Sequence, residues 1–275
     1  MKICSTYVPT EADHDQLPTH GSGSMRLCVA LAVASAVISV SVAGCRPEAQ
    51  VTRIQARPIA PTARIEPGAH PLGMGRPRVR DMTWRDGTLY VPRSAKNRPL
   101  PLLVLLHGGG GRGDDFRDAF SPLVDEFDVA IVTLDARDNT WDGIDSPYGP
   151  DVLSIDATLK HVFDRVAIDP ARIALGGLSD GASYALSVGR ANGDLFTHLV
   201  AVAPGYYDSP APPVGRPRIF VGHGVRDNVY SVSTSRNRIV PKLMEEGYDV
   251  TYVEFDGPHW VMPAAARLAL EWLTK

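Results

Sequence analysis

The sequence predicts an α/β fold with a mostly parallel central sheet and helices on both faces. From about residue 80 onward, short apolar runs rich in Val, Ile and Leu alternate with segments of helical periodicity, which is typical of chains built from βα units. The chain has 275 residues, of which 44% are hydrophobic, so it can bury one full core. We therefore expect one α/β domain preceded by an N-terminal region of a different character.

That N-terminal region divides into two parts. Residues 1–24 are polar and unpatterned, and we interpret them as a disordered leader or an extension upstream of the true start. Residues 25–45 contain a basic start, an apolar run and the ending Val42-Ala43-Gly44-Cys45, which is the pattern of a secretory signal. This ending resembles the bacterial lipobox, which implies lipidation of Cys45 and export across the bacterial inner membrane to the cell envelope. A transmembrane helix is the alternative, but the run is shorter than the roughly 20 residues that a span needs.

Residues 46–79 are rich in Pro, Ala and Arg and show no periodicity. This composition is typical of an extended tether, so we expect ordered structure to begin near Val79 and the domain to occupy residues 80–275. Within it, Asp86-Gly87 lies at the centre of the alternating stretch 82–91 and predicts a two-residue hairpin.

The elements of the domain follow in order. The continuous apolar run 102–106 is typical of a central strand buried on both faces. Further strands are expected over 129–134, from 173 to 178, and over 199–203, 219–221 and 250–255. Helices are expected from Asp114 or Asp115 toward 127, over 151–166, directly after Ser179, over 235–246 and over 263–273.

Gly177-Leu178-Ser179-Asp180-Gly181 is a G-x-S-x-G segment between a predicted strand and a predicted helix. In this context the serine occupies a strained turn, the glycines let the backbone pass without a clash, and the hydroxyl stands clear of the sheet. Ser179 is therefore the candidate nucleophile. All three cysteines lie in the first 45 residues, so the domain has no thiol that could take this role.

A serine hydroxyl needs a base to take its proton and an acid to orient that base. His259 follows the strand 250–255, and Asp227 follows the strand 219–221, so both are expected at the carboxyl edge of a parallel sheet. The order Ser179, Asp227, His259 is that of a known class of hydrolases. Asp256 is the rival for the orienting role, but it would have to turn back through a short Gly-Pro loop.

The glycine run 108–111 follows the central strand and can supply backbone N–H groups to a developing oxyanion. We expect Gly109 to act with the N–H of Asp180, and Gly108 and Gly110 remain alternatives. Trp141 and Tyr206, with Tyr207, either line the substrate pocket or simply pack loops. His107 and His223 each end a strand and are interpreted as packing or supporting residues.

Four pieces together resemble the carboxylesterase kind of α/β-hydrolase, similar to phospholipase/carboxylesterases and polyhydroxybutyrate-depolymerase-like esterases. They are Leu-Leu-His-Gly-Gly-Gly-Gly at 105–111, Gly-Gly-Leu-Ser-Asp-Gly-Ala at 176–182, His-Gly-Val-Arg-Asp at 223–227 and Gly-Pro-His at 257–259. The resemblance covers about residues 80–275 and implies Ser179 as nucleophile, Asp227 as orienting acid and His259 as base. The domain departs from secreted polymer depolymerases because it lacks cysteines for the disulfides that those enzymes often carry.

We therefore expect a secreted serine esterase that forms an acyl-enzyme from a small-molecule ester and needs neither cofactor nor metal. A thioesterase or peptidase would use the same residues. Gly108–Gly113 also satisfies G-x-G-x-x-G, with Asp135 about 20 residues on, and favours a dinucleotide-binding protein as a rival. A non-catalytic binding lipoprotein on the same fold is a third alternative. The net charge of −3 and pI near 6.2 argue against a nucleic-acid partner.

Overall fold

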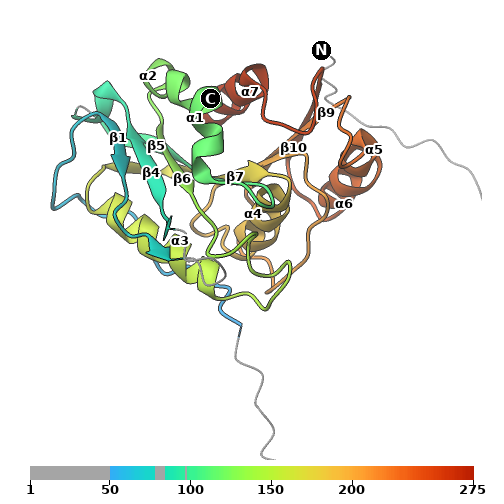
Figure 1. Ribbon diagram of the computed structural model, residues 1–275, viewed down its shortest axis with the longest axis horizontal. Coiled ribbons are helices and arrows are strands. Elements are labelled where there is room, and N and C mark those ends of the chain that lie inside the picture. Colours follow the sequence, from blue (N-terminus) through green and yellow to red (C-terminus); the bar gives the residue numbers. More distant parts are fainter. Residues whose placement is uncertain (1–49, 78–83, 97) are drawn as a thin grey trace, which may run out of the picture. The chain divides into compact units, whose positions relative to one another are not determined.

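An eight-stranded sheet forms the centre of the molecule (Figure 1). The structure, a computed structural model, describes residues 50–77, 84–96 and 98–275. In spatial order the strands are β1 (Gly68–Pro71), β4 (Gly87–Val91), β6 (Ala130–Leu134), β5 (Leu100–Leu106), β7 (Ile168–Leu178), β8 (His198–Val202), β9 (Arg218–Gly224) and β10 (Val250–Phe255). Six neighbouring strands are mutually parallel: β6, β5, β7, β8, β9 and β10. Strands β1 and β4 form an antiparallel edge. The prediction of a mostly parallel sheet is confirmed.

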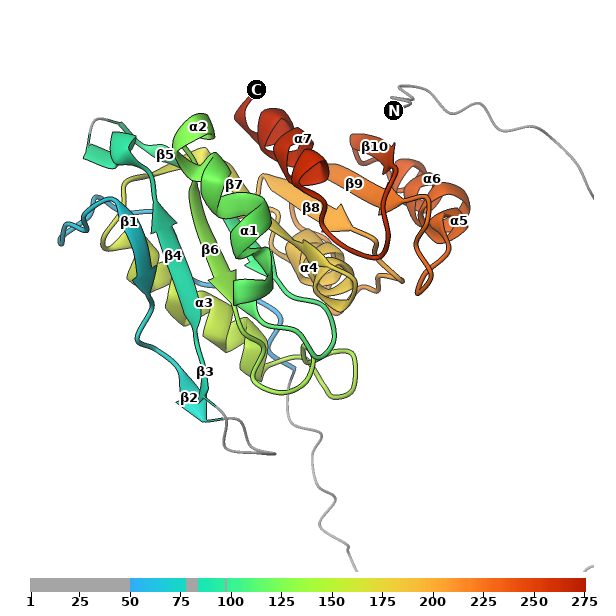
Figure 2. The same ribbon diagram turned by 45° about the horizontal axis from the view of Figure 1, so that its top comes forward.

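Helices cover both faces of this sheet, as Figures 1 and 2 show. Buried side chains of α3 (Pro150–Phe163), α4 (Asp180–Ala191) and α6 (Val240–Glu245) belong to one apolar cluster. Those of α1 (Arg117–Phe120), α2 (Val124–Phe127) and α7 (Pro263–Thr274) belong to the other. The helix α5 (Val232–Thr234) continues through a π-helical turn, Ser235–Ile239, into α6. The helix predicted to reach residue 127 is a series of short turns, interrupted where Pro122 contributes no N–H.

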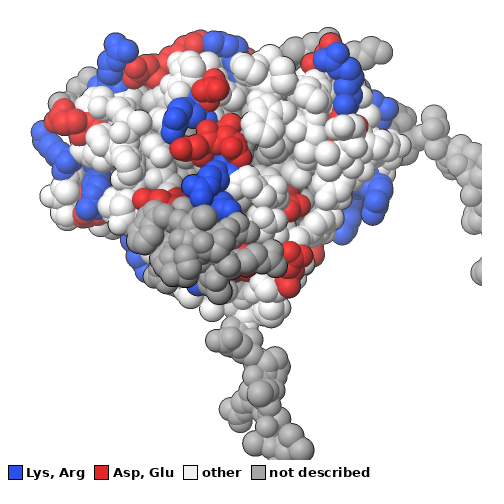
Figure 3. Space-filling view, in the orientation of Figure 1, with Lys and Arg blue, Asp and Glu red and all other residues white. Residues whose placement is uncertain are grey.

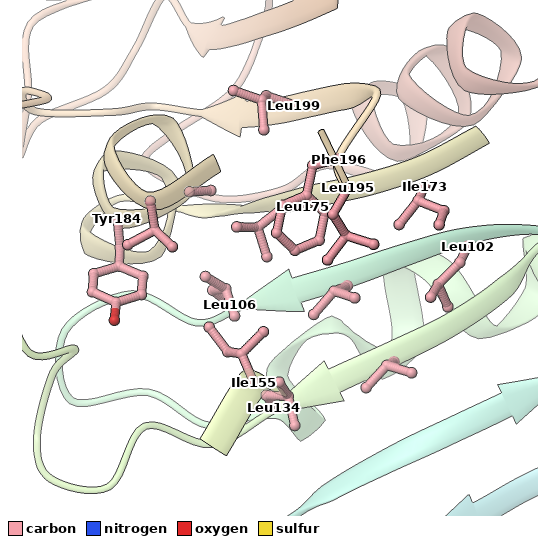
Figure 4. Packing of buried hydrophobic residues seen from close by; sticks show 14 of the residues in the cluster. Leu102, Leu106, Leu134, Ile155, Ile173, Leu175, Tyr184, Leu195, Phe196 and Leu199 are labelled. Carbon is pink, nitrogen blue, oxygen red and sulfur yellow. The ribbon is translucent and has the colours of Figure 1, made fainter. Parts of the chain in front are cut away.

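The alternation of side chains along the central strands explains the two clusters. Leu102, Val104 and Leu106 of β5 point to the face of α3 and α4, whereas Leu103 and Leu105 point to the face of α7. Successive strand residues face opposite sides, so a strand buried on both sides must be apolar throughout. Figure 4 shows the first face, where strand side chains pack against Ile155 of α3 and Tyr184 of α4.

The expected tether is wrong for residues 50–77, because this segment packs along the domain. Ile54 is fully buried, and its N–H donates to Oδ1 of Asn192 at 2.8 Å. The N–H groups of Gln55 and Ala56 both donate to Oδ1 of Asp156 at 2.7 Å. Burying one isoleucine side chain contributes about 1.5–3 kcal/mol, and the hydrogen bonds hold the extended chain in one position. A Pro-rich composition does not exclude such docking, because extended backbone can bind through regularly placed partners.

The hairpin at Asp86-Gly87 is also wrong. β3 (Trp84–Arg85) pairs with β2 (Arg76–Pro77) in a separate two-stranded sheet, and β4 pairs with β1 and β6. A Cβ at Gly87 would lie 2.3 Å from the carbonyl oxygen of Thr133. The glycine therefore permits the close approach of β4 to β6 rather than a tight turn.

Two further expectations concern residues that lie outside the described part of the chain. These are the leader 1–24 and the signal segment 25–45, which includes Cys45. Within the described part, none of the helices has the length and apolar character that a bilayer span requires. Figure 3 shows acidic and basic side chains interspersed on the face it displays, in keeping with the small net charge.

Candidate active site

The carboxyl ends of the parallel strands meet at one edge of the sheet. The register places Leu106 of β5 beside Gly177 of β7, and Gly224 of β9 beside Phe255 of β10. From these ends the chain continues into the glycine loop 107–111, Ser179, the loop that carries Asp227 and the loop that carries His259. The four sequence pieces therefore leave the sheet at its same edge.

Ser179 occupies a sharp turn between β7 and α4. Its backbone has φ 56° and ψ −116°, a conformation that costs a non-glycine residue about 1–3 kcal/mol and is found chiefly at functional sites. The two glycines of the motif allow the turn to press against β5: a Cβ would lie 2.4 Å from the carbonyl oxygen of Leu106 at Gly177, and 2.0 Å from it at Gly181. The serine is thus held in a strained position by its packing against the neighbouring strand.

Asp227 and His259 are joined by a short hydrogen bond. Nδ1 of His259 lies 2.6 Å from Oδ2 of Asp227, whose side chain is fully buried. Because a carboxylate only accepts, Nδ1 carries the proton and Nε2 of the neutral ring keeps its lone pair. The imidazole therefore has the tautomer that a general base requires.

Backbone contacts hold the two loops together. The N–H of Val225 donates to the carbonyl oxygen of Phe255 at 2.9 Å, and that of Arg226 to Gly257 at 3.0 Å. A Cβ at Gly224 would lie 2.4 Å from the Gly257 carbonyl oxygen, so only glycine allows this approach. The main-chain contacts thus fix the spacing of the two loops that carry the acid and the histidine.

The carboxylate of Asp227 is stabilised as an anion. Burial raises its pKa, but the hydrogen bonds from His259 and from the N–H groups of Val229 and Tyr230 outweigh burial, and the net pKa is lowered. Hydrogen bonds to the charged form have this effect because they are lost on protonation. An ionised Asp227 can therefore stabilise a positive charge that develops on His259.

Asp256 takes no part in this pair. Its Oδ1 lies 3.0 Å from Nε of Arg226, and both side chains are exposed to solvent. The structure thus brings Asp227, rather than Asp256, to the histidine.

Tyr230 links the histidine to the serine turn, and sequence reasoning missed it. Its ring meets that of His259 edge to face, with centroids 5.7 Å apart, and its hydroxyl end packs against Gly205. The N–H of Gly205 in turn donates to Oγ of Ser183, which lies one helical turn after Ser179. Burial raises the pKa of Tyr230, and the charge of Asp180 raises it further. The position of Tyr230, three residues after Asp227 in a loop that leaves a strand, was the available signal.

The glycine loop has only some of its N–H groups free. Gly110 donates to the carbonyl oxygen of Asn139 at 2.7 Å, and Gly111 donates to that of Gly108 at 3.0 Å. Among the hydrogen bonds of the described residues, the N–H groups of Gly108 and Gly109 are not donated, and a Cβ at Gly109 would lie 2.6 Å from Oδ2 of Asp180. The alternatives for an oxyanion donor in this loop therefore narrow to Gly109 and Gly108.

His107 orients this loop from within the protein. Its Nε2 accepts the N–H of Ala136 at 2.9 Å, so Nδ1 carries the proton and donates to the carbonyl oxygen of Gly108 at 2.6 Å. The peptide between Gly108 and Gly109 is planar and trans, so its N–H points opposite to that carbonyl. Burial lowers the pKa of His107, in agreement with a neutral ring.

Trp141 does not line a pocket, so the interpretation of this residue as part of the substrate pocket is wrong and loop packing is its role. The side chain is 1% exposed, its Nε1–H donates to the carbonyl oxygen of His107 at 2.8 Å, and its ring packs against those of His107 and Tyr184. Tyr207 is also buried and donates its hydroxyl to Glu246. Both side chains therefore pack inside the domain beneath the surface loops and do not face solvent.

Tyr206, by contrast, is 37% exposed. Burial of the rest of the side chain raises its pKa to about 12, and the nearby charge of Asp180 contributes to the shift. Trp260, directly after the histidine, is also exposed. Tyr206 thus leaves an exposed aromatic side chain close to Asp180, the residue after Ser179.

The described residues contain no group of three or more His, Cys, Asp or Glu side chains arranged to hold a metal ion. The G-x-G-x-x-G segment opens a 3₁₀ turn, Gly113–Phe116, rather than a full helix. A dinucleotide site of the βαβ type places its pyrophosphate at the N-terminus of such a helix, and that helix is missing here.

No model of a known protein family matches the sequence, and no curated protein matches it. Solved structures do match the fold. Esterase PE8 superposes with a TM-score of 0.56 at 22% identity, over 69% of this chain and 97% of PE8. FphF, a fluorophosphonate-binding serine hydrolase of Staphylococcus aureus, has a TM-score of 0.56 at 13% identity, over 77% of this chain and 100% of its own. A ferulic acid esterase has a TM-score of 0.56 at 18% identity, over 76% and 98%.

The protein therefore has the α/β-hydrolase fold. The solved structures that it resembles in this way include esterases and serine hydrolases.

Proposed function

We propose that the protein is a serine esterase that cleaves carboxylic esters through an acyl-enzyme intermediate. The observation that carries this proposal is the strained turn at Ser179, which lies at the same sheet edge as the hydrogen-bonded pair Asp227–His259. The esterases among the solved structures of the same fold support it.

In the acylation half, Oγ of Ser179 attacks the ester carbonyl carbon while Nε2 of His259 accepts the hydroxyl proton. The imidazolium that forms is stabilised by the ionised Asp227, which does not itself take up the proton. His259 then donates its proton to the departing alcohol oxygen. The alcohol leaves, and the acyl group remains as an ester of Ser179.

The tetrahedral intermediate carries a negative oxygen that needs donors already in place. We assign this role to the N–H of Gly109 and to that of Asp180, the first residue of α4, where the first-turn N–H groups have no partner within the helix. The partial positive charge of the helix N-terminus adds to the stabilisation.

In the deacylation half, His259 removes a proton from water, and the resulting hydroxide attacks the acyl carbon. The same donors hold the second oxyanion. The bond between the acyl carbon and Oγ of Ser179 then breaks, the carboxylic acid leaves, and His259 returns the proton to Ser179. Tyr206, exposed near the serine turn, is the residue that we assign to contact with the substrate.

Thioesters and amides could follow the same steps, because this machinery determines acyl transfer and not the leaving group. A panel of p-nitrophenyl esters of graded acyl length, with matched thioester and amide analogues, separates these reactions. The ester reading requires the highest kcat/KM on the esters.

A fluorophosphonate probe tests the nucleophile directly. We expect the probe to label the wild-type protein and not Ser179→Ala, and ester turnover to be lost with the label. Ser187→Ala is the matched control, because Ser187 lies two turns further along α4 and is buried. Labelling of Ser179→Ala at the wild-type rate would refute the assignment.

We also propose that the protein is exported and held in the cell envelope by a lipid at Cys45. The basic start, the apolar run and the ending Val-Ala-Gly-Cys support this proposal.

A further inference from the structure

A second histidine lies against the carboxylate of Asp227. His223, the second-last residue of β9, is fully buried, and its Nε2 lies 3.1 Å from Oδ2 of Asp227. The same Nε2 lies 3.0 Å from the carbonyl oxygen of Tyr230. On the other side of the ring, Nδ1 lies 2.7 Å from Oγ of Ser235. Every polar atom of this ring therefore has a partner in the loop or helix that follows β9.

These partners determine the tautomer of His223. Nε2 faces a carbonyl oxygen and a carboxylate oxygen, both of which only accept, so Nε2 must carry the proton. Nδ1 then has a lone pair and accepts the hydroxyl proton of Ser235. Burial lowers the pKa of His223, which keeps the ring neutral. A neutral ring donates its N–H to Asp227 without neutralising the carboxylate. The negative charge of Asp227 therefore remains available to stabilise a positive charge on His259.

Ser235, which contacts the ring of His223, lies at a local irregularity of the helix. It is fully buried and begins the π-helical turn Ser235–Ile239 between α5 and α6. Such turns are frequent at functional sites. The π turn thus carries the hydroxyl that donates to Nδ1 of His223.

Both backbone polar groups of Tyr230 are hydrogen-bonded. Its N–H donates to Oδ1 of Asp227 at 2.8 Å, and its carbonyl oxygen accepts the proton of His223. Removing the imidazole would release that carbonyl and leave Oδ2 of Asp227 without the neighbouring N–H dipole. The loop that aims the carboxylate at His259 would then be free to turn.

We propose that His223 and Ser235 form a buried relay that positions Asp227 against His259, with His223 as a positioning residue rather than a catalytic one. This inference rests on the proposed function, in which Asp227 orients the base. The ionisable groups that face His223 are Asp227 and His259 from the loops and Glu254 from β10, its register partner, which is itself paired with Arg236. None of these groups places a permanent positive charge in contact with the ring of His223.

The first test compares kinetic constants of purified full-length variants on p-nitrophenyl acetate. We expect His223→Ala to lower kcat about 10- to 100-fold with little change in KM, because a displaced orienting group weakens the base without removing a substrate contact. Ser235→Ala should lower kcat in the same sense but less, and His223→Asn, whose side-chain N–H can reach Asp227, should recover part of the loss. His198→Ala and Ser187→Ala are matched controls, because both residues are buried and belong to other parts of the fold.

A double-mutant cycle separates positioning from packing. In an Asp227→Asn background, His223→Ala should change kcat by less than about threefold, because the group that it positions is already lost. A loss of kcat by the same factor in both backgrounds would overturn the proposal. The proposal would also be overturned if each variant that lowers kcat lost thermal stability to the same extent as His198→Ala, because a packing defect would then explain the loss of kcat.

A readout that does not need turnover keeps this inference distinct from the proposed function. The proton between Nδ1 of His259 and Asp227 should give a far-downfield proton NMR signal that is absent from Asp227→Asn. We expect His223→Ala to shift or broaden this signal and His198→Ala to leave it unchanged. If the wild-type protein hydrolyses no ester, the proposed function fails while this signal still tests the relay, and a signal unaltered in His223→Ala refutes the relay alone.

Discussion

Gly181 lies so close to the carbonyl oxygen of Leu106 that a Cβ at Gly181 would be 2.0 Å from it. The contact joins the start of α4 to the end of β5. Ser179 is therefore positioned by the packing of a helix against a strand, and the glycine is needed for the approach and not for a positive φ, which Gly181 does not have.

The first prediction follows from this contact. Gly181→Ala should destabilise the protein by several kcal/mol and abolish ester turnover, because the new methyl group meets backbone that cannot move aside. Gly247→Ala is the control: it has φ +83° but nothing within 4 Å of an added Cβ, so it should cost about 1 kcal/mol. Urea unfolding followed by circular dichroism measures both, and equal losses for the two variants would contradict the steric explanation.

The second prediction concerns the two acids near His259. Asp227→Asn should lower kcat by about 10⁴-fold while the protein stays folded, because the histidine loses the group that selects its tautomer. Asp256→Asn should keep nearly full activity, since Asp256 pairs with Arg226 at the surface. Steady-state kinetics on one p-nitrophenyl ester decides between them. Full activity of Asp227→Asn would remove Asp227 from the mechanism.

The third prediction is that the free energy of unfolding falls as the pH drops from about 6.5 to 4. Burial lowers the pKa of His198 to about 4, and the charges of Arg218 and Arg172 contribute. In the unfolded chain a histidine titrates near pH 6.5, so acid protonates the unfolded state first; stability present above pH 6.5 is lost down to pH 4, about 3 kcal/mol for His198 at most. The lowered pKa values of His107 and His223 act in the same direction.

Asp151 opposes this trend. Burial and the charge of Asp142 raise its pKa to about 6, so its contribution to stability is present below its unfolded pKa and is lost as the pH rises through 6. Urea unfolding at pH 7 and pH 5 should therefore show a smaller pH effect in His198→Gln and a larger one in Asp151→Asn. The same pH effect in wild type and His198→Gln would contradict the assignment to His198.

The fourth prediction concerns the envelope anchor. Expressed in a bacterium, the wild-type protein should sediment with membranes. Cys45→Ser should prevent lipidation and release the protein from the membrane fraction. Cys28→Ser is the matched control, because this cysteine lies within the apolar run and not at its end. Fractionation and immunoblotting measure the distribution. A Cys45→Ser protein that still sediments fully would favour an uncleaved transmembrane helix.

Much of the fold was predictable because its signals are local. The apolar run ending at Leu106 has the composition of a strand buried on both sides, and the G-x-S-x-G motif around Ser179 is a pattern of five consecutive residues. The predicted hairpin failed for a related reason. Asp86-Gly87 has the local chemistry of a turn, but Gly87 serves a contact with Thr133, which lies on a strand distant in the sequence.

The sequence by itself determined the order of strands and helices, the strained serine turn, and the positions of Asp227 and His259 after strands of a parallel sheet. Only the tertiary structure decided that Asp227 and not Asp256 meets His259, that residues 50–77 dock on the domain, that Trp141 is buried, and that His223 and Tyr230 flank the candidate site. The reason is physical. Periodicity and turn chemistry act between neighbours along the chain, whereas each of these contacts depends on distances between segments that only the packed sheet brings together.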